Sequence, residues 1–246
     1  MLLCYDGGPY KGWQPHPELP TVCGVLAAAL HRAGVDATPF GASRTDAGVH
    51  ARAQVASFTT HAELEVEKVQ RALSADLPST LQLLALREAG SSFHAHWSSI
   101  GKVYRYRISF RGGTGAWRLP FLRLDLPRLE QALAMLREAP DVSALAAPGE
   151  HGPATRRLDR ATVLESSAGG VLLEFAAAGF GKHLVRHLVG AAAGFAAGTF
   201  DERALSQMIA GQVSRPPRAE ADGLTLHQVL YPAELDPFPD VDLLAT

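Results

Sequence analysis

The sequence has little cysteine, almost no net charge and no long apolar run, and each shortage excludes a class of protein. Its 246 residues include only Cys4 and Cys23, which lack metal-ligand spacing and are too few for a disulfide framework, so we expect reduced, buried thiols. No apolar run is long enough to span a bilayer. The apolar start at residues 1–5 is too short for a signal peptide, so a cytoplasmic chain is expected.

The net charge of -2 argues, taken alone, against a nucleic-acid-binding protein, because affinity for phosphates needs clustered cations. The distribution of charge matters more. Acidic residues are missing from residues 99–124, a stretch that carries Lys102, Arg105, Arg107, Arg111, Arg118 and Arg123. This basic stripe is either a solvated face or part of a nucleic-acid interface. Arg156, Arg157 and Arg160 are open to the same two interpretations.

Apolar residues make up 47% of the chain, enough for one large domain or two of ordinary size. Periodicity predicts a strand at 2–5, a helix at 21–33, extended runs before and after residues 41–54, a helix at 65–77 and a strand at 81–86. The order strand, helix, strand, strand, helix, strand is that of a ferredoxin-like, RRM-like unit.

A second round of elements follows the Gly112-Gly113 pair, after a strand at 102–108. The pattern predicts a helix at 127–138, strands at 161–165 and 171–176, a helix at 182–197 and a strand at 224–230. The Pro-, Gly- and Ala-rich residues 139–157 are expected to form a mobile insertion. We therefore predict an α/β (α+β) protein with two ferredoxin-like domains, 1–98 and 99–246, whose antiparallel sheets are flanked by helices.

A loop between two strand-like runs holds the most reactive candidate, Asp46. Gly41 and Gly48 permit backbone conformations and close approaches that other residues resist, and Arg44 and Arg52 bring guanidinium groups near the carboxylate. Loops on rigid strands often display reactive groups. The alternative is that Asp46 only forms an Asx turn. His50, considered alone, is equally consistent with a structural role.

Strand 102–108 places Lys102, Tyr104 and Tyr106 on one face and Arg105 and Arg107 on the other. Aromatic rings interleaved with cations are typical of a surface that binds a nucleobase and its phosphate. A strand with one buried and one solvent-exposed face would show the same pattern.

Two further patterns, an arginine beside an apolar helix face and a pair of histidines, each have an ordinary structural explanation. On the helix at 182–197, Arg186 falls just beyond the edge of an apolar arc, where an arginine ordinarily reaches toward solvent. His94 and His96 alternate without a third ligand nearby, so we expect no metal site.

Residues 43–51 read Ser-Arg-Thr-Asp-Ala-Gly-Val-His-Ala, which resembles the Gly-Arg-Thr-Asp-Ala-Gly-Val-His-Ala signature of the tRNA pseudouridine synthase A family. The resemblance extends to the Gly-Trp-Gln at 12–14, a Tyr-Arg-Tyr motif beginning at Tyr104, and the helix around Arg186. It implies that Asp46 is the catalytic aspartate, that Tyr104 stacks on the target base and that Arg186 pairs with Asp46. The chain departs from the family at Gly8, His96 and His187, where Thr, Arg and Asn are usual.

The resemblance also implies an activity and partners. It indicates isomerisation of uridine to pseudouridine at positions 38, 39 and 40 of the tRNA anticodon stem-loop, without cofactor or metal, by a homodimer with a central RNA-binding cleft. The residues expected to contact RNA are Arg44, His50, Lys102, Arg105, Arg107, Arg156 and Arg157.

The chemistry is consistent with a single carboxylate. A glycoside hydrolase ordinarily needs two carboxyl groups, and the motif around Asp46 holds no second acid. An arginine within reach favours the charged form of a buried carboxylate, which gives Arg186 a role. Stacking on Tyr104 offsets the cost of unstacking the target base, and Tyr104 is also a candidate for removing the C5 proton. Two alternatives stay open: a non-catalytic RRM-like RNA-binding module, and a small-molecule hydrolase that uses Asp46.

Overall fold

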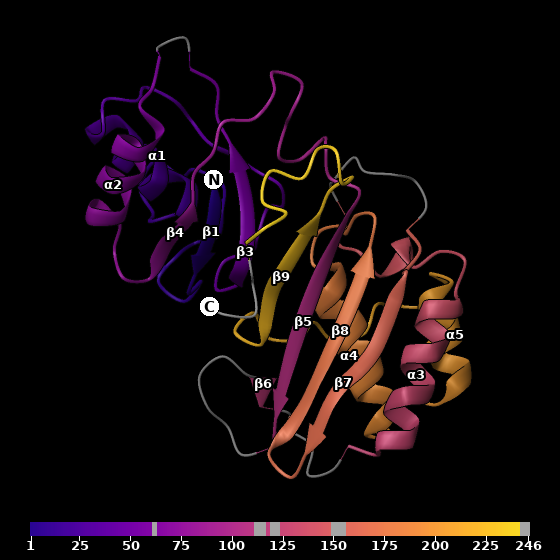
Figure 1. The fold of residues 1–246 in the computed structure, drawn as a ribbon. Coiled ribbons are helices and arrows are strands. Elements are labelled where there is room, and N and C mark those ends of the chain that lie inside the picture. Colours follow the sequence, from indigo (N-terminus) through magenta and orange to yellow (C-terminus); the bar gives the residue numbers. More distant parts are fainter. Residues whose placement is uncertain (61–62, 111–116, 119–123, 149–155, 242–246) are drawn as a thin grey trace. The chain divides into compact units, whose positions relative to one another are not determined.

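The computed structural model describes residues 1–60, 63–110, 124–148 and 156–241, and the backbone of residues 117–118 (Figure 1). Arg111 and Arg123 of the basic stripe, and residues 149–155 of the expected insertion, lie outside the described residues. The chain divides into two compact units, the first built from residues 1–100 and 225–246 and the second from residues 101–224. Within the described ranges, no helix is long and apolar enough to cross a membrane.

The first unit has the predicted order of elements. They are β1 (Leu2–Tyr5), α1 (Val22–Arg32), β2 (Phe40–Gly41), β3 (His50–Ser57), α2 (Val66–Asp76) and β4 (Leu81–Ala85). The strands pair antiparallel in the order β4-β1-β3-β2, and α1 and α2 lie together beside them (Figure 1). The predicted order of strands and helices is therefore confirmed for this part of the chain.

The last strand, β9 (Leu224–Leu230), changes the character of this sheet. It pairs in parallel with β3, with His50 opposite Thr225 and Ala51 opposite Leu226. β2 pairs only with the end of β3, at Ala56 and Ser57. The start of β3 is therefore left open on this side, and β9 pairs with it there. The sheet is therefore mixed, and the prediction of purely antiparallel sheets is wrong at this point.

Helix α1 begins and ends where the sequence predicts. The hydroxyl of Thr21 accepts a hydrogen bond from the Gly24 N–H at 3.2 Å, which caps the first turn. Gly34 follows the helix with φ of 83°, a conformation that glycine adopts without strain. Leu26 and Leu30 of α1 and Leu73 of α2 are fully buried and form the core beneath the helices.

The second unit contains three neighbouring antiparallel strands with helices on one face of them (Figure 1). Its strands β5 (Gly101–Ser109), β8 (Gly170–Ala177) and β7 (Arg160–Ser167) lie in that order, and β6 (Trp117–Arg118) pairs in parallel with β5. The helices are α3 (Leu126–Glu138), α4 (Leu184–Ala196) and α5 (Glu202–Ile209), with a 3₁₀ turn η1 (Ser143–Leu145).

Three features of the second unit differ from expectation. Val142 and Leu145 are fully buried, so this part of residues 139–157 is packed core and not a mobile insertion. Helix α5, capped by Asp201, was not predicted. Helix α4 is buried on all sides except at His187, so it has no solvent face, and Arg186 is itself buried.

Candidate active site

The loop that carries Asp46 runs from β2 to β3 and is fixed by the backbone of a neighbouring segment. The Trp13 N–H donates to the Thr45 carbonyl at 3.0 Å, and the Gly48 N–H donates to the Tyr10 carbonyl at 3.3 Å. A turn closes between them, because the Val49 N–H donates to the Asp46 carbonyl at 3.1 Å. The backbone of Asp46 is thereby held on both sides.

A network of buried hydrogen bonds also holds this loop against β1 and β3. The Tyr5 hydroxyl lies 2.8 Å from the Thr45 hydroxyl. Gln54, which is fully buried, donates to the Ser43 carbonyl at 2.7 Å and accepts from the Ser43 N–H at 3.2 Å. Buried polar groups of this kind hold one arrangement, because any other arrangement leaves them without partners. The residues before Asp46 are therefore rigidly placed on β1 and β3.

Close backbone packing explains two glycines at this loop. Gly12 has φ of 90°, and a Cβ there would lie 2.7 Å from the Thr45 carbonyl oxygen. A Cβ at Gly41 would lie 2.6 Å from the Trp13 ring. Trp13 is buried, which agrees with the interpretation of its ring as a core residue.

His50, the first residue of β3, contacts the turn after β1. Its Nδ1 lies 3.2 Å from the Gly7 N–H donor and 3.1 Å from a carboxylate oxygen of Asp6. These contacts fix the imidazole beside the Asp46 loop. Arg44 is exposed and Arg52 is half-buried. The expected RNA contacts of Arg44 and His50 stay predictions.

In the second unit, β5 separates its side chains as the alternation predicts. Lys102, Tyr104 and Tyr106 are buried, whereas Arg105 is half-buried and Arg107 is exposed. The Tyr106 hydroxyl donates to the Glu220 carbonyl at 2.9 Å, and burial raises the pKa of this phenol well above its ordinary value. Tyr106 is therefore a packing residue. Burial also lowers the pKa of Lys102.

The ring of Tyr104 is set by a residue that the sequence analysis did not identify. The Phe180 ring meets it edge to face, with centroids 5.1 Å apart and planes at 85°. Phe180 stands between Gly179 and Gly181, and a Cβ at Gly181 would lie 3.1 Å from Nε of Arg156. The Arg156 side chain thus lies against the segment that presents Phe180.

Arg186 is held by the segment before β9. Its Nε donates to the Ala219 carbonyl at 2.8 Å, and the Ala219 N–H donates to the Arg186 carbonyl at 3.0 Å. The next residue, His187, has its Nδ1 2.9 Å from the Pro216 carbonyl. Burial lowers the pKa of His187, and the nearby charges of Arg215, Arg218 and Arg186 lower it further. Arg186 is therefore a fixed, buried cation, which the apolar arc of the helix did not reveal.

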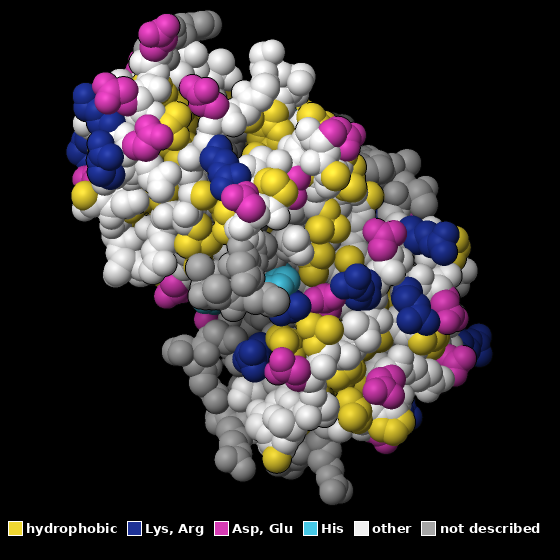
Figure 2. Space-filling view, in the orientation of Figure 1, with side chains coloured by type: hydrophobic (Ala, Val, Ile, Leu, Met, Phe, Trp, Pro, Cys, Tyr) yellow, Lys and Arg dark blue, Asp and Glu magenta, His cyan; other side chains and the backbone are white. Residues whose placement is uncertain are grey.

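On β5, β8 and β7, the face opposite Tyr104 carries an ion-pair cluster centred on Glu174. The Glu174 side chain is almost fully buried. Arg105 Nε lies 2.9 Å from one carboxylate oxygen, and Arg160 binds the other. Figure 2 shows cationic and acidic side chains interspersed over these strands. Burial raises the pKa of Glu174, but hydrogen bonds from Arg160 and Arg105 lower it by more, so its net pKa is below the usual range. The RNA contacts expected of Arg105, Arg107, Arg156 and Arg157 stay predictions.

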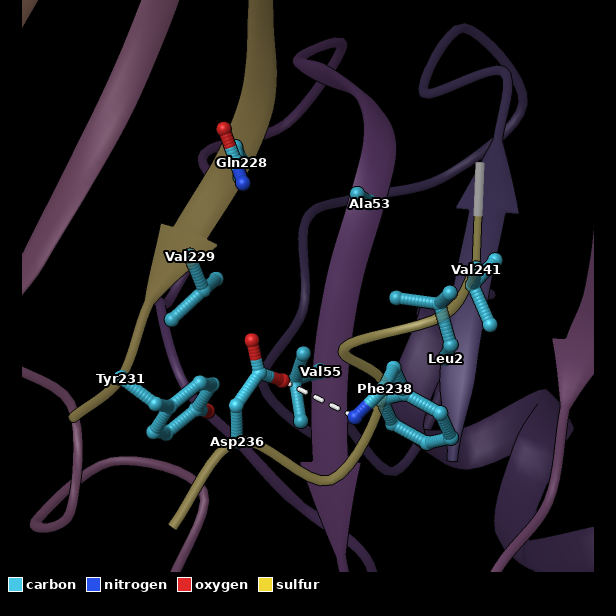
Figure 3. Close-up of a pocket in the computed structure, with 9 residues that line it drawn as sticks. All are labelled: Leu2, Ala53, Val55, Gln228, Val229, Tyr231, Asp236, Phe238 and Val241. Carbon is cyan, nitrogen blue, oxygen red and sulfur yellow. Dashed lines mark hydrogen bonds between the residues drawn. The ribbon is translucent and has the colours of Figure 1, made fainter. Parts of the chain in front are cut away.

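A small pocket lies elsewhere on the first unit, beside β1, β3 and β9 (Figure 3). Most of the residues that line it are apolar, and the Asp236 carboxylate in it accepts a hydrogen bond from the Phe238 N–H at 2.9 Å. None of the residues predicted from the motifs lines this pocket. Across the described residues, no three His, Cys, Asp or Glu side chains gather as a metal site would require.

Comparison with known proteins assigns the chain to a family. The sequence profile described as "tRNA pseudouridine synthase" matches residues 4–98 and 140–232. A tRNA pseudouridine synthase A of Moorella thermoacetica is 35% identical over 242 residues, which are 94% of this chain and 98% of that protein. A protein of the same name from Akkermansia muciniphila is 35% identical, with 95% of each chain covered. One from Azorhizobium caulinodans is 34% identical, covering 96% of this chain and 95% of that one. The matched ranges include Asp46, Phe180 and Arg186, and the chain belongs to the tRNA pseudouridine synthase family.

Proposed function

We propose that this chain isomerises uridine to pseudouridine in tRNA, at positions 38, 39 and 40 of the anticodon stem-loop. The observation that carries the proposal is the Asp46 loop: the family signature at residues 43–51 lies on a turn fixed by buried hydrogen bonds from Tyr5, Gln54 and Trp13. A reactive carboxylate held this firmly needs no reorganisation when a substrate arrives.

The reaction breaks the bond from ribose C1′ to uracil N1, turns the base, and joins C1′ to C5; the C5 proton leaves and N1 takes up a proton, so the product is an isomer of uridine. A carboxylate can act by attack on C1′, by addition to the base, or by removing a ribose proton. Each route requires the ionised form of Asp46. We propose that Arg186, whose guanidinium is oriented by Ala219, supplies the cation that pairs with the Asp46 carboxylate.

Tyr104 is the proposed stacking partner of the target base. Removing a base from its stack costs about a few kcal/mol, and an aromatic face offsets part of that cost. The edge contact from Phe180 holds the Tyr104 ring in one orientation, so the face is ready before the base arrives. The hydroxyl of the same tyrosine is our candidate for accepting the C5 proton.

The finer architecture follows from this assignment. We propose that domains 1–98 and 99–246 enclose an RNA-binding cleft in which Asp46, Tyr104 and Arg186 meet, and that two copies of the chain form a homodimer in the cytoplasm, where its tRNA substrate is found. Phosphate contacts are assigned to Arg44, His50, Lys102, Arg105, Arg107, Arg156 and Arg157, and neither a metal nor a cofactor takes part.

Chemical mapping of pseudouridine tests the proposed positions. Transcribed tRNA with uridine at 38, 39 and 40 is incubated with the protein, treated with carbodiimide and copied by reverse transcriptase, which stops beside each pseudouridine. We expect stops at these positions alone, and none when cytidine replaces each uridine. Stops elsewhere in the tRNA, with none in the anticodon stem-loop, would reject the proposed substrate.

A further inference from the structure

A group of exposed rings lies on the first unit, close to the root of the Asp46 loop. Trp97 is 79% exposed and Phe40 is 60% exposed, the largest exposures among the large apolar side chains that the structure describes. His94 and His96 lie beside them in the sequence segment 93–98. We call Phe40, His94, His96 and Trp97 the aromatic platform. Exposed apolar side chains that gather in one patch, unlike single exposed residues, indicate an interaction site.

The rings of the platform adjoin one another. The His94 ring centroid lies 5.7 Å from that of Phe40 and 6.1 Å from that of Trp97. His96 meets the Trp97 ring edge to face at 4.7 Å. The rings form one contiguous group, and because their planes are tilted to one another by 40–80°, each exposed ring offers a separate face to a ligand.

The turn that presents Trp97 is held by its own hydrogen bonds. Nδ1 of His94 accepts from the N–H groups of His96 and Trp97, at 3.1 and 3.2 Å. The Ser98 hydroxyl accepts from the His94 N–H at 3.0 Å. The indole is therefore offered from a fixed backbone, so little conformational freedom is lost when a ligand binds.

The platform and the catalytic loop share one frame. His96 Nδ1 lies 2.8 Å from the carbonyl of Ala42, the first residue after β2 and part of the chain that leads to Asp46. The Ala95 N–H donates to the Ser57 hydroxyl at the end of β3. Phe40 belongs to β2 itself. A ligand on the platform is thus placed in a fixed relation to Asp46, through β2 and β3.

We propose that the aromatic platform binds an unpaired nucleobase of the RNA substrate, with Trp97 as the principal stacking surface. The inference rests on the proposed function, because flipping a uridine into the site leaves neighbouring bases without their stacking partners. Tryptophan, phenylalanine and histidine rings are the surfaces on which proteins stack single-stranded bases. The exposed Arg44 on the adjoining loop adds a cation suited to the phosphate of the same nucleotide.

The test measures binding of fluorescein-labelled tRNA transcript by proteins that all carry Asp46→Asn, so that no turnover accompanies the titration. Because alanine substitution of a stacking ring costs about 1–3 kcal/mol per base, we expect Trp97→Leu to weaken binding about 5- to 150-fold. Trp97→Phe, which keeps a ring, should lose less than about threefold. Leu164→Ala, which truncates an exposed side chain on β7, serves as the control and should bind as the parent does.

Salt dependence separates stacking from loss of a phosphate contact. The slope of log affinity against log salt should be the same for Trp97→Leu and its parent, because no phosphate contact is removed. With a stem-loop whose loop nucleotides lack bases, Trp97→Leu and the parent should bind equally. Unfolding midpoints of all variants confirm that each is folded.

Three results would overturn the proposal. The first is unchanged tRNA affinity in Trp97→Leu, and the second is a loss of affinity for the abasic stem-loop as large as the loss for tRNA. The third is a change in self-association without a change in RNA affinity, which would make a second copy of the chain the occupant. Pseudouridine formation by the protein that retains Asp46 is measured separately. Formation of product together with unchanged binding by Trp97→Leu rejects the platform alone, whereas absence of product rejects the proposed function.

Discussion

Gly12 offers a sharp test of how the Asp46 loop is held. Replacing it with alanine forces a residue with a side chain to adopt φ of 90° and brings its Cβ to 2.7 Å from the Thr45 carbonyl oxygen and 3.1 Å from the Ala47 nitrogen. The first effect costs about 1–2 kcal/mol. The second pushes on backbone atoms that flank Asp46 and costs about 1–3 kcal/mol more. Gly12→Ala should therefore lower the free energy of unfolding by about 2–5 kcal/mol.

Gly34 provides the matched control. Its φ is 83°, and a Cβ there would meet nothing within 4 Å. Gly34→Ala should cost only the conformational term of about 1–2 kcal/mol and leave activity unchanged. The entropy that alanine removes from the unfolded chain is the same in both variants and cancels in the comparison.

Urea unfolding and steady-state kinetics on tRNA measure the two consequences. A misplacement of about 1 Å can cost on the order of 100-fold in rate, so we expect the kcat of Gly12→Ala to fall steeply while Gly34→Ala keeps the parental kcat. Equal stability losses in the two variants, with kcat preserved in both, would refute the idea that the Tyr10–Trp13 segment positions the loop.

Three further predictions concern the second unit. Glu174→Gln should destabilise the protein by about 1–3 kcal/mol at neutral pH, because it leaves Arg105 and Arg160 without their shared anion. Because the pKa of Glu174 is lowered in the folded state, its stabilising contribution is present above pH 4.5, the ordinary pKa of a glutamate, and is lost as the pH falls through the native pKa. An acid unfolding profile that is the same in Glu174→Gln and the parent would contradict this. The pKa of His187 is lowered in the folded state, so as the pH falls below 6.5 the unfolded state takes up a proton before the folded state does. The free energy of unfolding should therefore decline in this range, by at most about 1.4 kcal/mol per pH unit. In His187→Asn that part of the slope should vanish in unfolding measurements between pH 5 and 6.5, and an unaltered slope would count against the assignment. Phe180→Leu, which removes the ring edge beside Tyr104, should lower kcat about 2- to 12-fold with KM for tRNA nearly unchanged, whereas a rise in KM alone would assign Phe180 to binding.

Local signals predicted the first unit well. Thr21 and Gly34 mark the ends of α1 because capping and left-handed glycine depend on neighbouring residues alone. The ferredoxin-like order likewise follows from alternating periodicities. The parallel pairing of β9 with β3 joins strands far apart in the chain, and no local pattern encodes such a pairing.

Burial of polar groups was harder to predict than the order of elements. A helical wheel placed Arg186 at the edge of an apolar arc, but the structure buries it, because the segment at Ala219 covers the side that the wheel leaves to solvent. Glu174 gave a usable signal, a lone acid within the apolar run of β8, which points to a buried partner. Phe180 gave none, since its role depends on where Tyr104 lies.

Release of tritium from tRNA labelled at uridine C5 tests the central claim most directly, because the C5 proton leaves only when C1′ becomes bonded to C5. The parent protein and Asp46→Asn are compared, with tRNA binding measured for both. We predict release by the parent alone, with both proteins binding tRNA. If neither released tritium while both bound tRNA, the chain would be an RNA-binding module, and the catalytic role of Asp46 would be contradicted.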